Sequence, residues 1–209
     1  MVFDSLPTSA PLFVTAKVQN SDFGISRELL KIGFREINRQ VTYRKELNAL
    51  DHRPEAELTI PLGCNIVVQN SLPQFAKFSC LFEFDRFTMD ESLPPSWSSI
   101  IKGKWIEGAD SNKRFVVVFA AEQVVGFILF SEGLAYTIEL LCVLKEYRGK
   151  GVARYMLYFL EELARERLIS EIAVGTQKEN PSSTYVYHSS GFVLANQQRV
   201  LHFSRGIDL

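Results

Sequence analysis

Hydrophobic residues in the second half of the chain follow two periods, one typical of helices and one typical of strands. Between residues 152 and 166, apolar side chains recur every three or four positions with charged side chains between them, which predicts an amphipathic helix of about four turns. Shorter apolar runs of strand length lie on both sides of it. We predict strands at 114–121, 124–131, 136–144, 171–175, 192–195 and 200–203, and a second helix at 181–188. The expected order is β-β-β-α-β-α-β-β.

The first half of the chain shows the same patterns less regularly. We predict strands at 11–18 and 41–44 and helices at 26–32 and 98–106. Turn-forming residues gather at 93–96 and 107–112, and we place a domain boundary near Gly108. The sequence thus predicts an α/β chain in which an N-terminal α/β domain, residues 1–108, precedes a second domain, residues 109–209.

Composition narrows the class of protein. The 209 residues are 46% hydrophobic and 22% charged, which is typical of a globular protein, and the formal net charge of -1 gives no general attraction to nucleic acid or to an anionic membrane. The three cysteines and three histidines are scattered, so neither a disulfide framework nor a metal site is indicated. The sequence shows no signal-peptide pattern and no apolar run of membrane-spanning length, so we expect a cytoplasmic protein.

A short glycine-containing loop lies between the strand predicted at 136–144 and the long amphipathic helix. It consists of Arg148, Gly149, Lys150, Gly151, Val152 and Ala153. Small residues let a ligand approach the backbone, and the unpaired N–H groups of a helix start favour an anion, as do the two basic side chains. The loop therefore indicates phosphate binding, with a solvated strand-to-helix turn as the alternative. It matches neither the dinucleotide-binding motif nor the P-loop motif.

Two motifs resemble those of the GNAT superfamily of acyl-CoA N-acyltransferases. Arg148-x-x-Gly151-x-Ala153 is similar to that superfamily's Gln/Arg-x-x-Gly-x-Gly/Ala pyrophosphate loop. Its second signature is matched, with serine in place of the usual alanine, at Asn180, Ser183, Tyr187, Gly191 and Phe192. The resemblance implies the GNAT fold, a mixed central sheet flanked by helices, together with N-acetyltransferase activity. It also implies acetyl-CoA as co-substrate, without a metal.

The same resemblance implies how the coenzyme would be bound. Backbone groups of Leu141 and Val143 would pair with the pantetheine arm as an added strand does, and the N–H of Val143 would meet the oxyanion of the tetrahedral intermediate. The loop residues 148–153 would bind the pyrophosphate. Asn180 would hydrogen-bond the coenzyme, with Gln177 as a further candidate beside it.

Three residues are candidates for the chemical step. Tyr187 would donate a proton to the leaving thiolate, since the tyrosine pKa near 10 keeps its hydroxyl protonated at neutral pH; a core aromatic is the alternative. Glu139 stands alone among apolar residues and is a candidate base for the amine, with an ordered water chain as the alternative. Cys142 invites a nucleophile interpretation, but the superfamily usually transfers the acyl group directly, so we expect a small buried side chain there.

Upstream features resemble one branch of the superfamily, the dTDP-fucosamine N-acetyltransferases. They are Asp22-x-Gly24-Ile25, Leu30-x-x-Gly33-Phe34, Asp85-Arg86-Phe87, Asp90 and Trp105-Ile106. This branch acetylates the amino group of a nucleotide-linked 4-amino-4,6-dideoxy sugar in the synthesis of bacterial surface polysaccharide. The resemblance implies that the acceptor enters between the two halves, with Arg86 near a nucleotide phosphate and Phe87 or Trp105 as a stacking surface.

Two other functions stay open at this point. One is acetylation of a protein or peptide amine, and the other is a non-catalytic acyl-CoA-binding module, against which Tyr187 argues. The partner expected from the resemblance is a small-molecule amine. Whether the chain forms a homodimer is left open.

Overall fold

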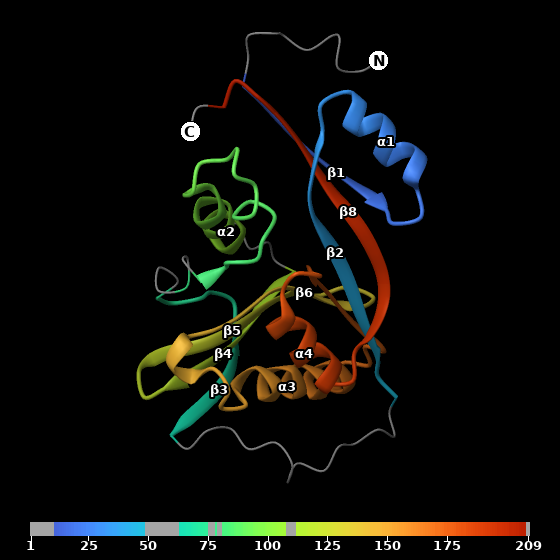
Figure 1. Cartoon of the computed structure of the whole chain (residues 1–209). Helices are drawn as coiled ribbons and strands as arrows, with labels where there is room; N and C mark the ends of the chain where they lie inside the picture. Colours follow the sequence, from blue (N-terminus) through green and yellow to red (C-terminus); the bar gives the residue numbers. More distant parts are fainter. Residues whose placement is uncertain (1–10, 49–62, 75–77, 79–80, 108–111, 208–209) are drawn as a thin grey trace.

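The computed structural model describes residues 11–48, 63–74, 78, 81–107 and 112–207. Within these ranges the strands form one sheet of eight strands in the order β1-β8-β2-β7-β6-β5-β4-β3 (Figure 1). The strands are β1 (Leu12–Gln19), β2 (Arg35–Glu46), β3 (Cys64–Gln69), β4 (Lys113–Ala120), β5 (Gln123–Ser131), β6 (Tyr136–Val143), β7 (Glu171–Gln177) and β8 (Val193–Arg205). The helices are α1 (Phe23–Lys31), α2 (Trp97–Glu107), the short 3-10 helix η5 (Lys145–Tyr147), α3 (Val152–Glu166) and α4 (Pro181–Ser189).

The sheet is mixed. Strands β6 and β7 are parallel neighbours, and the other neighbouring pairs are antiparallel. Helices lie on both sides of it (Figure 1). The predicted α/β fold, a mixed central sheet flanked by helices, is therefore confirmed.

Alternate residues of the strands belong to separate hydrophobic clusters, because successive strand side chains point to opposite faces of the sheet. On one face Met156 and Leu160 of α3 are fully buried in a cluster that includes α4 and the even-numbered valines of β4. On the other face Ile106 of α2 packs with the odd-numbered residues of β4. Leu29 of α1 packs on a third, smaller cluster over β1 and β8. These packed layers fix the elements that surround the site.

The local periodicity predicted most elements, and three strands differ. The segments expected as separate strands at 192–195 and 200–203 form the single strand β8, because the polar residues between them pair through their backbones with β2 on one side and β1 on the other. Strand β3 was not predicted at all. Strand β2 runs well beyond the predicted 41–44, since its polar positions pair with β7 and β8.

Residues from both predicted domains contribute to the same sheet. Strand β2 lies between β8 and β7, so a strand from before residue 108 is inserted among strands from after it. Gly108 itself lies outside the described residues. The division at residue 108 remains a prediction about folding units, and the sheet is continuous across it.

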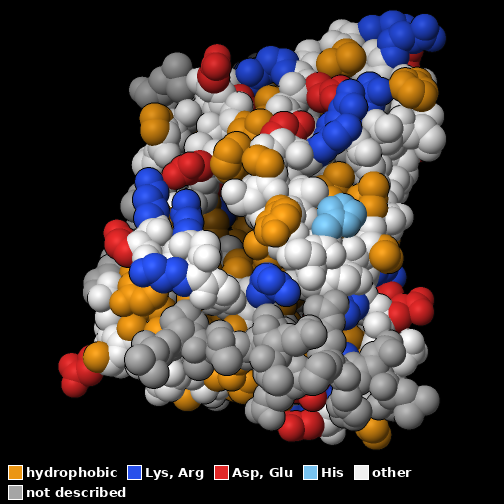
Figure 2. All heavy atoms as spheres, turned by 60° about the horizontal axis from the view of Figure 1, so that its bottom comes forward, with side chains coloured by type: hydrophobic (Ala, Val, Ile, Leu, Met, Phe, Trp, Pro, Cys, Tyr) orange, Lys and Arg blue, Asp and Glu red, His pale blue; other side chains and the backbone are white. Residues whose placement is uncertain are grey.

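The surface carries charges of both signs. On the face shown in Figure 2, lysine and arginine side chains are interspersed with aspartate and glutamate. None of the helices in the described ranges has the length and apolar character that crossing a membrane requires.

Candidate active site

Strands β6 and β7 separate part of the way along their length. They pair in parallel only from Tyr136 to Ile138 of β6. Directly afterwards β6 has a bulge at Glu139, where its register against β5 shifts between Leu129 and Phe130. A bulge bends the strand that carries it. The remainder of β6 thus has no strand partner on its β7 side among the described residues.

The backbone groups of Leu141 and Val143 point toward this opening. The N–H of Leu144 donates to the carbonyl of Val125 at 2.9 Å, so the polar groups of Leu144 face β5. Backbone groups alternate between the two edges of a strand, which turns those of Val143 and Leu141 the other way. The Arg148 Nε donates to the Val143 carbonyl from that side at 3.1 Å. This edge of β6 therefore faces the opening, where the resemblance predicts an extended ligand.

The loop before α3 requires glycine at two positions. Gly149 and Gly151 have φ values of +73° and +85°, in the left-handed region that favours glycine. A Cβ added to either would meet no atom within 4 Å, so open space lies in front of the backbone. Gly151 is the N-cap of α3, and no side chain of the described residues caps this helix. The first N–H groups of α3 are thus left for a ligand.

The two basic residues of this loop have different surroundings. Arg148 ties the loop to β6 through the hydrogen bond to Val143. Lys150 instead places its Nζ 5.3 Å from the ring centroid of Tyr147, as a cation-π contact. Arg148 faces the opening between the strands, whereas Lys150 lies outside it.

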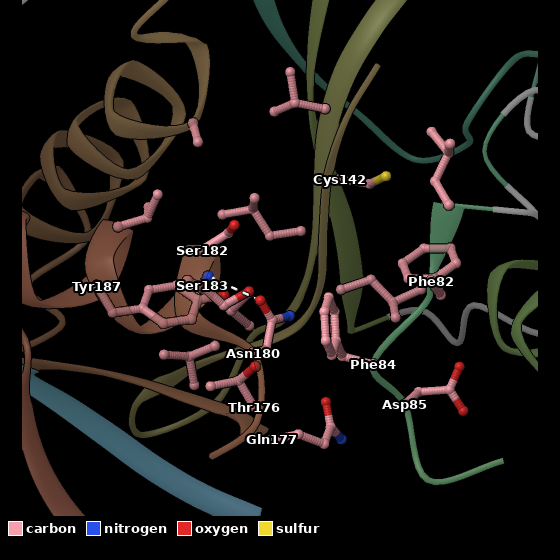
Figure 3. A pocket seen from close by; sticks show the side chains of 18 of the residues that line it. Phe82, Phe84, Asp85, Cys142, Thr176, Gln177, Asn180, Ser182, Ser183 and Tyr187 are labelled. Carbon is pink, nitrogen blue, oxygen red and sulfur yellow. Dashed lines mark hydrogen bonds between the residues drawn. The ribbon is translucent and has the colours of Figure 1, made fainter. Parts of the chain in front are cut away.

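One cavity of about 640 Å³ brings together the candidate catalytic, coenzyme-binding and acceptor-binding residues predicted from the sequence, with one exception (Figure 3). Those that line it are Arg86, Phe87, Trp105, Glu139, Leu141, Val143, Arg148, Gly149, Gly151, Val152, Ala153, Gln177, Asn180 and Tyr187. Lys150 is the exception. The opening between β6 and β7, the loop and the segment before α2 therefore form one continuous site.

Tyr187 reaches the cavity from α4 and is 4% exposed. Its ring packs against Tyr43 and Phe192, with centroid distances of 6.0 and 5.8 Å. Burial raises the pKa of the Tyr187 hydroxyl above its ordinary value. No hydrogen bond joins this hydroxyl to another described residue. Its proton is therefore held at neutral pH and is free to be donated to a ligand.

Asn180 and Gln177 stand beside Tyr187 in Figure 3. The Oδ1 atom of Asn180 accepts a hydrogen bond from the Ser183 N–H at 3.1 Å and so caps α4. This leaves the Asn180 amide nitrogen as a donor toward the cavity. Pro181 at the first helical position fits the same start.

Glu139 lies at the bulge of β6 with its side chain 25% exposed. Its Oε2 atom is 3.0 Å from the Nζ of Lys113, in an ion pair. The bulge thus brings a carboxylate to the cavity wall, but that carboxylate already has an ammonium partner. Cys142 of β6 is buried in a hydrophobic cluster, in agreement with the packing role expected for it.

The wall opposite Tyr187 comes from the segment before α2. In Figure 3, Phe82, Phe84 and Asp85 face Asn180 and Gln177 across the cavity. The Oδ2 atom of Asp85 accepts from the Nζ of Lys102 at 2.6 Å and also from the hydroxyl of Ser98. Although burial alone would raise the pKa of Asp85, Lys102 and these hydrogen bonds lower it. The ion pair fastens this segment to α2.

Arg86 has no such partner. Its guanidinium lies over the ring of Phe87 at 4.6 Å, and its Nε is buried without a hydrogen bond to a described residue. Phe87 is buried and contacts Phe13 and His202, so its ring supports Arg86. Burial lowers the pKa of Arg86, against the attraction of Asp85.

The structure also brings residues to the cavity that the sequence analysis did not single out. They include Gln40, Phe82, Phe84, Lys102, Tyr147 and Thr176. No local motif marks them, since they come from β2, η5, β7 and the segment around α2. No group of three or more His, Cys, Asp or Glu side chains in the described ranges is arranged to hold a metal ion.

Fold and cavity together define a class of protein: a mixed sheet opened between two parallel strands, with a glycine loop and a helix start at the mouth of the opening. A family model for the acetyltransferase (GNAT) family matches residues 79–192, more than half of the chain. The chain therefore belongs to this family of acyltransferases, which typically uses acetyl-CoA.

Solved structures agree with the fold. A GCN5-related N-acetyltransferase from Sphaerobacter thermophilus is 19% identical with a TM-score of 0.64, and the match covers 100% of this chain and 65% of that one. A tandem GNAT protein from the clavulanic acid biosynthesis pathway is 15% identical with a TM-score of 0.62, covering 95% and 65%. A GCN5-related N-acetyltransferase from Kribbella flavida is 13% identical with a TM-score of 0.60, covering 91% and 68%.

The chain thus spans about two thirds of the length of these structures. No curated protein sequence matches it significantly.

Proposed function

We propose that the protein is an acetyl-CoA-dependent N-acetyltransferase that transfers the acetyl group directly to a primary amine. The observation that carries this proposal is the meeting, in one cavity, of the free β6 edge, the left-handed glycines of the loop and the buried Tyr187. Acetyl-CoA would bind along this edge, with its pyrophosphate at the start of α3. The scattered cysteines suit the reducing cytoplasm in which we place this reaction.

The residues of the cavity support a direct transfer. The N–H of Val143 faces the opening and would stabilise the oxyanion that forms when the amine nitrogen attacks the thioester carbonyl. Tyr187 would then give its proton to the departing sulfur as the C–S bond breaks, leaving free CoA and an N-acetyl amine. The amine proton would pass to Glu139 or to a water chain, and the Lys113 ion pair of Glu139 favours the water chain.

The acceptor is proposed to be the amino group of a nucleotide-linked 4-amino-4,6-dideoxy sugar. Arg86 and Trp105 line the same cavity, and such an acceptor would bind beside them. Phe87 would act here by supporting Arg86, since its own ring is buried. A protein or peptide amine is the second candidate.

Release of free thiol from acetyl-CoA tests this function. Thiol release is expected when dTDP-4-amino-4,6-dideoxygalactose is added and not in its absence. Release that depends instead on a lysine-containing peptide would assign the second acceptor class. Tight CoA binding without turnover for either amine would contradict the enzyme and leave a binding module.

A further inference from the structure

Two cations, Arg86 in the cavity wall and Lys17 of β1 outside it, have no close carboxylate partner among the described residues. Arg86 makes no hydrogen bond or close ion pair with a described residue, and the carboxylate of its neighbour Asp85 is engaged by Lys102. Lys17 of β1 likewise has no carboxylate partner in the described part of the chain. Partial burial and the charge of Arg86 lower the pKa of Lys17. Two like charges held together destabilise a protein unless an anion lies between them.

The sheet geometry places both cations on the same side. Lys17 and Phe13 share one face of β1, because they are four residues apart along the strand. Phe13 contacts Phe87 with a centroid distance of 6.2 Å, and Arg86 lies over that same Phe87 ring. The segment that carries Arg86 therefore covers the face of β1 from which Lys17 projects.

A row of four glutamines runs from this point into the cavity. Gln19 lies opposite Gln198, Gln198 opposite Gln40, and Gln40 opposite Gln177. The row thus crosses β1, β8, β2 and β7 on one face, and Lys17 is two residues from Gln19 on that face. Gln40 and Gln177 line the cavity together with Arg86. Carboxamides both donate and accept hydrogen bonds, so this floor suits a polar, hydroxylated ligand.

From these contacts we infer that Arg86 and Lys17 bind an oxyanion of the acceptor, a phosphate or a carboxylate, while the glutamine row supports the part of the acceptor between that anion and its amine. The inference rests on the proposed function and adds the second residue that binds the charged end of the acceptor, and the length of the acceptor. Three strand spacings separate β1 from β7, about 14 Å. The anion and the amine of the acceptor are therefore separated by on the order of 10 Å, and a free α-amino acid is too short.

Anion binding by CoA-loaded protein tests this site without knowledge of the acceptor. Saturating CoA occupies the loop before α3, so a second anion must bind elsewhere. Isothermal titration at low ionic strength with inorganic pyrophosphate, and separately with succinate, is expected to show saturable binding of at least one of them. Binding of pyrophosphate alone assigns a phosphate, and binding of succinate assigns a carboxylate.

Charge-removing variants locate the anion. Arg86→Gln and Lys17→Gln are each expected to lower the affinity for the anion at least 10-fold while leaving the affinity for CoA unchanged. Lys31→Gln on α1, whose Nζ pairs with Glu28 at 2.7 Å, is the matched control and should bind as the unaltered protein does. If the Arg86→Gln variant fails to fold, the anion affinity of the Lys17→Gln variant tests the inference.

Two results would overturn the inference: no binding of either anion to CoA-loaded protein, or equal anion affinity in the variants. A chain that does not bind CoA at all would instead refute the proposed function, so the two failures are distinguishable.

Discussion

The two sides of the cavity recognise ligands by different means. On the loop side, the groups offered to a ligand belong to the backbone: the free edge of β6, the positions Gly149 and Gly151, and the first N–H groups of α3. On the opposite side, around Arg86 and Lys102, they belong to side chains that come from distant parts of the chain.

This difference separates what is common to a family from what is particular to one member. Backbone groups point where the local conformation puts them, so the same loop can serve any chain that folds in this way. Side chains such as Arg86 and Gln40 can be exchanged without altering the fold, so acceptor choice can vary on the same scaffold.

The largest expected effect is on the loop side. Gly151→Glu places a carboxylate before the free amides of α3 and forces a non-glycine residue into a φ of +85°. We expect CoA affinity to fall by more than about 100-fold, because like charges would share the pyrophosphate site. Isothermal titration with CoA measures this. Gly24→Glu, in α1 with open space around it, is the control, and equal affinity in both variants would remove the loop from the site.

Tyr187→Phe tests whether the Tyr187 hydroxyl donates the proton to the leaving sulfur. The substitution removes a hydroxyl that no described residue bonds, so stability and CoA affinity should hardly change. We expect kcat to fall by roughly 10- to 1000-fold, because the leaving sulfur loses its proton donor. Tyr185→Phe, at a residue that is 71% exposed, is the control. Turnover as fast as that of the control would remove Tyr187 as the acid.

Asn180 allows a test of both roles, because its Oδ1 atom caps α4 while its amide nitrogen faces the cavity. Asn180→Ala removes the Oδ1 cap of α4 and should lower the free energy of unfolding by about 1 kcal/mol. Asn180→Ser keeps a capping oxygen but loses the amide nitrogen, so it should restore stability while CoA binding stays weakened. Urea unfolding and CoA titration separate the two effects; full recovery of CoA affinity in the serine variant would assign Asn180 to capping alone.

The last prediction concerns the stability of the acceptor side and its dependence on pH. His202 is buried and its Nδ1 lies 2.7 Å from Oδ2 of Asp90. Burial, together with Arg86 and Arg35, lowers the pKa of His202 despite the opposing effect of Asp90.

Below the ordinary pKa of 6.5, the unfolded chain therefore binds a proton that the folded one does not. Stability should fall as pH decreases from 7.5 to 5.5, by at most about 1.4 kcal/mol per pH unit. Urea unfolding of the protein and of His202→Gln measures this, and the variant should show a flatter pH dependence. An equal slope in both would place the acid sensitivity elsewhere.

The sequence predicted more of the residues on the loop side of the cavity than of those on the opposite side. Helix α3 was predicted with its observed bounds, and the loop, Asn180 and Tyr187 lie where their motifs suggested, because each depends on residues close in sequence. Gln40 and Phe84 carry no local signal. They reach the site only through strand pairing and through the segment before α2.

By itself, the sequence determined the helices, most strands and the glycine loop, since these follow from periodicity and from conformations that only glycine adopts readily. The tertiary structure alone decided that β2 is inserted between β7 and β8, that β6 bends away from β7 at Glu139, and that the segment with Arg86 packs on the face of β1 that carries Lys17. The physical reason is that long-range pairing places residues far apart in the chain, and no pattern within a few residues records which partner a strand edge will take.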